Sequence, residues 1–341
     1  MVGVGPAPKA PDSCSTLAAD EPLAGTAPFA RAWIAIEQPG SWGRDALRSN
    51  ALPVGIGPIL ADRAKAAEVG VLLIRHPRRP RHLSESDARS LWVAHIASNT
   101  LIRLESSNCR ELLNWDLAAI AHGDLSSIGA PGAGSANDTS VEQPLALICC
   151  HAARDACCAI HGRALYDALL AQSSPEGAKN LWQCSHLGGH RFAPTMLLLP
   201  LGAVYGRVDL LEAQSAIQAA SLDHLLPNNC RGQTRFTAPI QAADLYLRAT
   251  LPVLERCALT YDSRPCAESL RGSEGGKPQN NLPETAQTVL ARHLDGRAWA
   301  LLVTQESLGL VAPQSCGDVH RPLTTWRVQQ CQALTTHDGR A

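Results

Sequence analysis

An α/β fold is what this sequence predicts, and two features of its 341 residues point to it. Short apolar segments alternate along the chain with segments whose apolar residues recur at helical spacing, and such alternation is typical of layered α/β proteins. Two segments rich in Gly, Ser, Pro and polar residues, 122–144 and 262–286, lack this periodicity and indicate linkers or long loops. They divide the chain into three parts, in line with a usual domain size of about 150 residues.

The first part is predicted to hold a helix and two buried strands. The helix at 59–70 leads into an apolar strand at 69–76, "VGVLLIRH", and a second strand, "SLWVAHIA", follows at 90–97. The basic run "RHPRRPRH" at 75–82 predicts either a solvated loop, held extended by its two prolines, or a docking surface for a partner.

The middle part shows the clearest pattern. Its apolar runs and turn residues predict the order β-α-β-β-β-α, which is the order of a small thioredoxin-like domain. The predicted elements are a strand at 145–150, a helix at 162–172, a strand at 180–185, a hairpin of strands at 195–200 and 203–208, and a helix at 209–222.

The last part is predicted to be an α/β extension. A helix is expected at 238–257, and strands are expected at 298–306 and 324–334.

Composition and charge exclude several functional classes. The N-terminus has no basic start followed by an apolar stretch, and the longest apolar run, 196–204, is too short to span a membrane, so a cytoplasmic protein is expected. The formal net charge of −1 gives no sign of nucleic-acid or membrane partners. The phosphate-binding glycine motifs and the hydrolase G-x-S-x-G motif are absent from the sequence, so no catalytic residues are predicted.

Clustered Cys and His residues carry the chemistry. The chain has twelve cysteines, four of them in "CCHAARDACC" at 149–158. Cytosolic thiols are kept reduced, so such clusters favour metal or redox chemistry over structural disulfides. Downstream, "CSHLGGHRF" at 184–192 places two histidines around a Gly pair. Both stretches are predicted to lie in loops at strand ends, where side chains can converge.

One set of four residues suits a metal centre, and we call it the Cys2His2 group. Its members are Cys149, Cys158, His186 and His190. Such a set can hold either a tetrahedral Zn²⁺ or a [2Fe–2S] cluster with two Cys on one iron and two His on the other. The eight residues between the cysteines exceed the usual zinc-finger spacing, and spacing alone leaves both centres open.

These motifs resemble the sucrase/ferredoxin-like family, a group of thioredoxin-like ferredoxins. The resemblance rests on "CCHAARDACCAIHGR" and "LWQCSHLGGHRFAPTMLLLPLGAVYGR", with support from 41–47 and 231–244. Cys150 and Asp244 depart from the family pattern. The resemblance implies a [2Fe–2S] cluster held by the Cys2His2 group. We expect one-electron transfer with a separate redox partner protein. The second nitrogen of a ligating imidazole can carry a proton, so the electron transfer is expected to be coupled to proton uptake.

The predicted linkers and elements suggest a domain plan. A degenerate thioredoxin-like domain is expected at 1–122, a linker at 123–143, a thioredoxin-like [2Fe–2S] ferredoxin domain at 144–222 and a C-terminal extension at 223–341. The alternative function is a zinc-stabilised interaction protein without redox chemistry.

Residues around the predicted ligands have supporting roles. Gly188 and Gly189 allow tight turns and close approach to a cofactor. Arg154 and Asp155 are expected either to form a surface pair or to fix the loop and tune the cluster's charge. Arg191 would make the surroundings positive.

Three spare thiols are expected to be buried and inert: Cys150, Cys157 and Cys184. Cys150 should face away from Cys149, because neighbouring residues on a strand point to opposite faces. Cys157 is the best alternative to Cys158 as a ligand.

Overall fold

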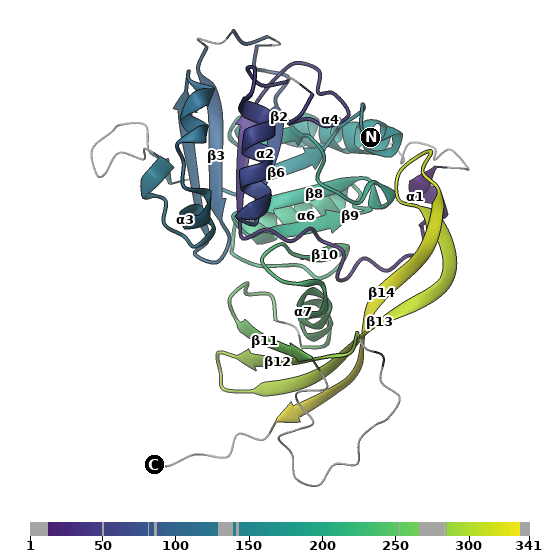
Figure 1. The fold of residues 1–341 in the computed structure, drawn as a ribbon. Coiled ribbons are helices and arrows are strands. Elements are labelled where there is room, and N and C mark those ends of the chain that lie inside the picture. Colours follow the sequence, from purple (N-terminus) through teal and green to yellow (C-terminus); the bar gives the residue numbers. More distant parts are fainter. Residues whose placement is uncertain are drawn as a thin grey trace.

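The computed structural model describes most of the chain (Figure 1). The described residues are 13–49, 51–80, 82–84, 87–128, 139–140, 143–251, 253–265, 283 and 285–334. Most of the two predicted linker segments, 122–144 and 262–286, lies outside these ranges, and the predicted domain boundaries stay a prediction.

Ten strands form one mixed sheet in the described ranges, in the order β10-β9-β8-β6-β7-β2-β1-β3-β4-β5. Only β1–β2 and β6–β7 pair in parallel within it. A short antiparallel pairing of β2 with β7 joins the first part of the chain to the middle part. The strands are β1 (Ala32–Glu37), β2 (Val69–Arg75), β3 (Arg89–His95), β4 (Thr100–Ser106), β5 (Thr139–Ser140), β6 (Leu145–Cys149), β7 (Leu181–Cys184), β8 (Thr195–Leu199), β9 (Ala203–Gly206) and β10 (Cys230–Gln233).

The predicted order of elements in the middle part is confirmed. Strand β6 is followed by helix α4 (Arg163–Gln172), the short helix α5 (Pro175–Lys179), strands β7, β8 and β9, and helix α6 (Leu210–Ala220). Asp209 starts α6 through a capping box, in which its carboxylate accepts from the Glu212 backbone and the Glu212 carboxylate accepts from the Asp209 backbone. The mixed α/β architecture agrees with the predicted thioredoxin-like ferredoxin fold.

The first part contains more strands than its sequence pattern predicts. The expected helix is α2 (Ile56–Ala66), and the two expected strands are β2 and β3, whereas β1 and β4 were not predicted. Three short helical segments also occur, α1 (Cys14–Leu17), η1 (Cys109–Leu113) and α3 (Leu117–Ala121), followed by the turn η2 (Ser126–Ile128).

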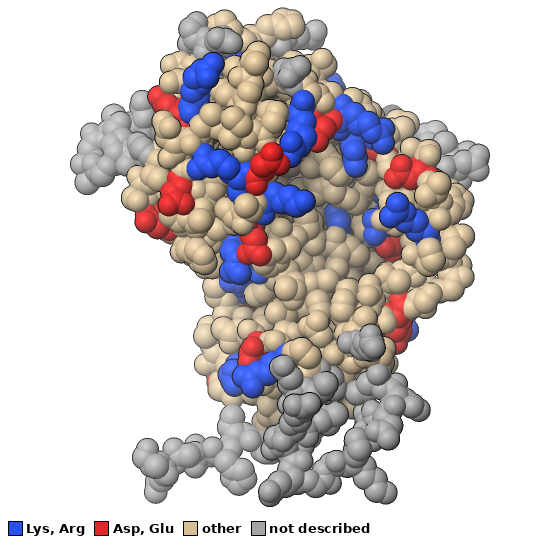
Figure 2. Space-filling model, viewed as in Figure 1, with Lys and Arg blue, Asp and Glu red and all other residues tan. Residues whose placement is uncertain are grey.

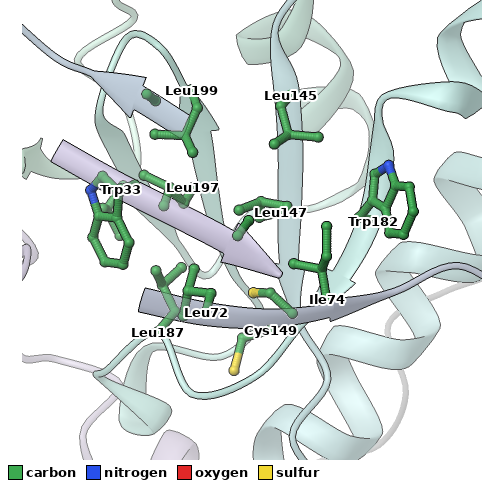
Figure 3. Close-up of a cluster of buried hydrophobic side chains, with 14 of the residues drawn as sticks. Trp33, Leu72, Ile74, Leu145, Leu147, Cys149, Trp182, Leu187, Leu197 and Leu199 are labelled. Carbon is green, nitrogen blue, oxygen red and sulfur yellow. The ribbon is translucent and has the colours of Figure 1, made fainter. Parts of the chain in front are cut away.

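Alternate residues of β6 enter two different cores. Leu145, Leu147 and Cys149 pack with Leu72 and Ile74 of β2 (Figure 3). The residues between them face the opposite side, where Ala146, Ile148 and Cys150 pack among side chains of α4 and α6. The two-residue period of a strand explains this division. It also confirms that Cys150 faces away from Cys149.

The last part forms a second, antiparallel sheet in the order β11-β12-β13-β14, with one helix packed on it. The elements are α7 (Ala238–Thr250), β11 (Leu259–Pro265), β12 (Gln287–His293), β13 (Ala298–Pro313) and β14 (His320–Leu334). Helix α7 is shorter than predicted because Leu251, which precedes a proline, is extended.

The β13–β14 hairpin is longer than predicted and reaches back to the large sheet. In Figure 1 its yellow ribbon curves up to helix α1, and Ala312 and Leu323 of the hairpin pack against Ala18 at the end of that helix. The start of the described chain and the tip of this hairpin are therefore brought together beside the middle part.

Charges of both signs are mixed on the face shown in Figure 2, as the net charge of −1 suggests. Among the described residues, no helix has the length and apolar character needed to cross a membrane.

Candidate metal centre

The carboxyl ends of two parallel strands form the base of the site. Cys149 ends β6 and pairs in register with Cys184, which ends β7. Both thiols are fully buried. After β6 the chain forms a loop and then a π-helical turn, Cys158–Gly162, which continues into α4.

Gly162 explains how that turn comes so close to the strand end. A Cβ atom placed on Gly162 would lie 2.0 Å from the carbonyl oxygen of Cys149. Only a residue without a side chain permits this approach. The contact brings Cys158, at the start of the turn, back toward Cys149.

The two histidines lie at either end of a tight turn. Gly188 and Gly189 both have positive φ, 85° and 74°, a conformation that favours glycine. The turn stacks the rings of His186 and His190, with centroids 4.2 Å apart and an interplanar angle of 18°. The Gly188 N–H donates to Nδ1 of His186 at 3.3 Å.

The predicted ligands lie next to one another. Cys158 Sγ is 3.5 Å from Nδ1 of His190. Hydrogen bonds from Cys158 and Cys184, and a further one from His186, hold the pKa of the Cys149 thiol well below its ordinary value despite its burial. The same contact with Cys149, together with burial, raises the pKa of Cys158. Burial lowers the pKa of His190 to about 4, with a smaller effect from His186.

A family comparison agrees with this arrangement. Residues 23–232 match the family described as sucrase/ferredoxin-like, which is more than half of the chain. The chain belongs to the sucrase/ferredoxin-like family. Comparisons with curated proteins and with solved structures gave no match.

In this sucrase/ferredoxin-like chain, a buried arginine supports the histidine turn. Arg231 of β10 donates through Nη1 to the Gly188 carbonyl at 2.9 Å and through Nε to Oγ1 of Thr26 at 3.0 Å. Burial lowers the pKa of Arg231 to about 9. Sequence reasoning noted the segment that contains Arg231 but assigned no role to the residue. Its position on a neighbouring strand, β10, depends on tertiary pairing.

The other predicted site residues have individual surroundings. Asp155 accepts from the backbone N–H of Cys157 at 2.8 Å, which fixes the loop after β6. Arg191 forms a bidentate ion pair with the Glu21 carboxylate, at 2.6 and 2.7 Å. Arg154 buries its Nε atom without a hydrogen-bond partner among the described residues.

A second group of potential ligands lies beside the first, and we call it the Cys3Asp group. Its members are Cys14, Asp155, Cys157 and Cys316, whose ligand atoms all lie within 4.8 Å of one another and could hold a metal ion. The Cys157 thiol thus points to this group, while its neighbour Cys158 meets His190. Cys14 and Cys316 lie outside the matched residues 23–232. Their separation of 302 positions left no spacing signal in the sequence.

Proposed function

We propose that this chain is an iron–sulfur electron-transfer protein whose [2Fe–2S] cluster is held by the Cys2His2 group. The observation that carries the proposal is the meeting of the four side chains at one strand end. Two thiols from the β6–α4 segment contact each other and two stacked imidazoles. When bound, such a cluster would supply reversible one-electron chemistry.

The local electrostatics suit ligands of this kind. A metal binds thiolate and neutral imidazole, the deprotonated forms of Cys and His. The pKa of Cys149 is lowered by its hydrogen bonds from Cys158 and Cys184, and the pKa of His190 is lowered by burial, so both residues favour the ligating form. Burial of Cys149, Cys158 and His190 also excludes water.

Membership of the sucrase/ferredoxin-like family is what favours the iron–sulfur cluster over zinc. Ligand atoms around one tetrahedral Zn²⁺ lie roughly 3.3–3.8 Å apart, given metal–ligand distances of about 2.0–2.3 Å. The 3.5 Å between Cys158 Sγ and His190 Nδ1 lies in that range, so this distance does not separate the two centres.

Proton coupling is part of the proposal, and His186 is its best carrier. His186 is partly exposed, whereas His190 is 4% exposed. The nitrogen of His186 that is not bound to metal could exchange a proton with solvent as the electron arrives. The midpoint potential should then fall with rising pH by up to about 59 mV per unit. A potential that stays flat between roughly pH 6 and pH 10 would remove the proton from the proposal.

The test is the iron and acid-labile sulfide content of freshly purified protein and two cysteine variants. Cys158→Ser should lose iron and sulfide, because a hydroxyl is a poor substitute for thiolate. Cys150→Ser is the matched control and should keep both, since the Cys150 thiol packs in the core on the opposite face of β6. Colourless protein that contains zinc and no sulfide would favour the zinc-stabilised interaction protein instead.

A redox partner completes the proposal. An electron carrier exchanges its electron with a separate protein that reduces or oxidises it. Spectroscopic reduction of the purified chain by a low-potential chemical reductant should proceed without any added substrate.

A further inference from the structure

We infer that the Cys3Asp group is a structural zinc site that fastens the C-terminal hairpin to the loop beside the Cys2His2 group. Three thiols form a triangle whose sides are 3.5 Å from Cys14 to Cys157, 3.4 Å from Cys157 to Cys316 and 3.6 Å from Cys316 to Cys14. The Asp155 carboxylate stands 3.7–3.8 Å from the sulfurs of Cys14 and Cys316. The inference is independent of the proposed electron-transfer function.

These distances fit the edges of a tetrahedron around Zn²⁺. With Zn–S bonds of about 2.3 Å and Zn–O bonds of about 2.0–2.2 Å, tetrahedral angles give S–S edges of about 3.8 Å and S–O edges of about 3.6 Å. The sulfur triangle is only slightly smaller than that, so small side-chain movements would admit the ion. Three thiolates and one carboxylate complete a closed four-ligand shell, as in structural zinc sites.

The carboxylate is already held in a ligating position. Oδ2 of Asp155 accepts from Oγ of Ser315 at 2.7 Å and from the backbone N–H of Cys316 at 2.8 Å. Its Oδ1 accepts from the backbone N–H of Cys157 at 2.8 Å. Hydrogen bonds of this kind orient metal ligands and are important for affinity.

The ligands come from three segments that are distant in sequence. Cys14 belongs to α1, Asp155 and Cys157 to the loop after β6, and Cys316 to the turn between β13 and β14. In Figure 1 this turn meets α1 beside the middle part. Cys316 is partly exposed, which gives an ion a way in.

The inference also explains why two neighbouring thiols diverge. Cys157 meets Cys14 and Cys316, while Cys158 meets His190. An ion on Cys157 would hold the start of the π-helical turn and thereby the position of Cys158. A disulfide is the competing outcome, but it would join only two of the three sulfurs and leave one thiol over.

The experiment measures zinc in a full-length chain that cannot bind metal at the first group. Cys149→Ser/Cys158→Ser protein, kept reduced and stripped by a chelator, is titrated with Zn²⁺ and with Co²⁺. It should bind one ion per chain, and Co²⁺ should show thiolate charge-transfer and tetrahedral bands. Adding Cys316→Ser should abolish the site. Adding Cys331→Ser should leave it intact, because Cys331 is exposed on β14.

Two further measurements separate a metal site from ordinary packing. Ser315→Ala should weaken zinc binding by roughly 10- to 100-fold, because it removes one of the three hydrogen bonds that orient the Asp155 carboxylate. Zinc should slow hydrogen exchange in the 314–319 turn of the parent protein and leave it unchanged in Cys316→Ser. Equal zinc affinity with and without Cys316, or a disulfide among these thiols in reduced preparations, would overturn the inference.

Discussion

Gly162→Ala tests how the Cys2His2 group is assembled. Gly162 has ordinary helical dihedrals, φ −65° and ψ −41°, so alanine meets no backbone obstacle there. Its new Cβ atom would lie 2.0 Å from the carbonyl oxygen of Cys149, whereas real Cβ contacts are essentially never shorter than 3.0 Å. The end of β6 and the π-helical turn must therefore separate by about 1 Å.

That displacement decides the outcome. Metal–ligand distances tolerate deviations of about 0.2 Å, so a shift several times larger should prevent Cys149 and Cys158 from serving one iron together. Overpacking of this kind typically costs about 1–3 kcal/mol, against a usual total stability of about 5–15 kcal/mol. The variant should therefore fold and yet fail to hold the proposed cluster.

The assay compares iron, acid-labile sulfide and the free energy of unfolding in urea. Gly40→Ala is the matched control, since the nearest heavy atom to its new Cβ lies 3.8 Å away. The control should retain iron and stability. If Gly162→Ala retains full iron and unfolds within about 0.5 kcal/mol of the parent protein, the reasoning from close approach is wrong.

Three further outcomes are expected. Replacing His186 or His190 by Cys should lower the midpoint potential of a retained cluster, because thiolate adds negative charge that neutral imidazole lacks. Redox titration measures this potential, and an unchanged value in both variants contradicts the ligand assignment. Arg79→Ala removes two 2.8 Å hydrogen bonds from the fully buried Glu37 carboxylate. Because Arg79 is itself 34% exposed, Arg79→Ala should lower the free energy of unfolding in urea by about 1–3 kcal/mol, rather than by the 3–5 kcal/mol of a fully buried pair. The same substitution should lower it by less in a Glu37→Gln background, and equal decreases in the two backgrounds would argue against the pair. Burial lowers the pKa of His76, so the unfolded chain takes up the proton first, and the free energy of unfolding should decline as pH falls below about 6.5; His76→Gln should flatten that part of the profile, and an identical profile would count against the explanation.

The middle part of the fold was predictable because its signals are local. Apolar runs of four to six residues, turn residues and a capping Asp209 mark each element without reference to the rest of the chain. Strand β10 was missed for the opposite reason. Its Arg231 and Gln233 are buried polar residues, and a polar strand becomes stable only through partners such as Thr26 and Gly188 on other segments.

The basic run at 75–82 shows the same limit on a smaller scale. Its composition predicts a solvated loop or a docking surface, yet several of its side chains contact the protein itself. Arg75 stacks on the Trp42 ring at 4.4 Å, His76 is buried, and Arg79 pairs with Glu37. Charge alone does not reveal these contacts, because each partner lies on another segment.

The two cysteine groups differ in sequence separation, and this difference accounts for which one the sequence revealed. The Cys2His2 group is built from a Cys pair nine positions apart and a His pair four positions apart. Each pair lies in one loop that follows a predictable strand. The second group needs Cys14 and Cys316, which meet only because the β13–β14 hairpin folds back onto α1. Cys157 was the alternative ligand that the sequence suggested for the Cys2His2 group, and it is a member of the Cys3Asp group. Successive residues of a helical turn point roughly 100° apart, so neighbouring thiols at its start can serve two different groups, and the choice between Cys157 and Cys158 depends on three-dimensional packing rather than on motif spacing.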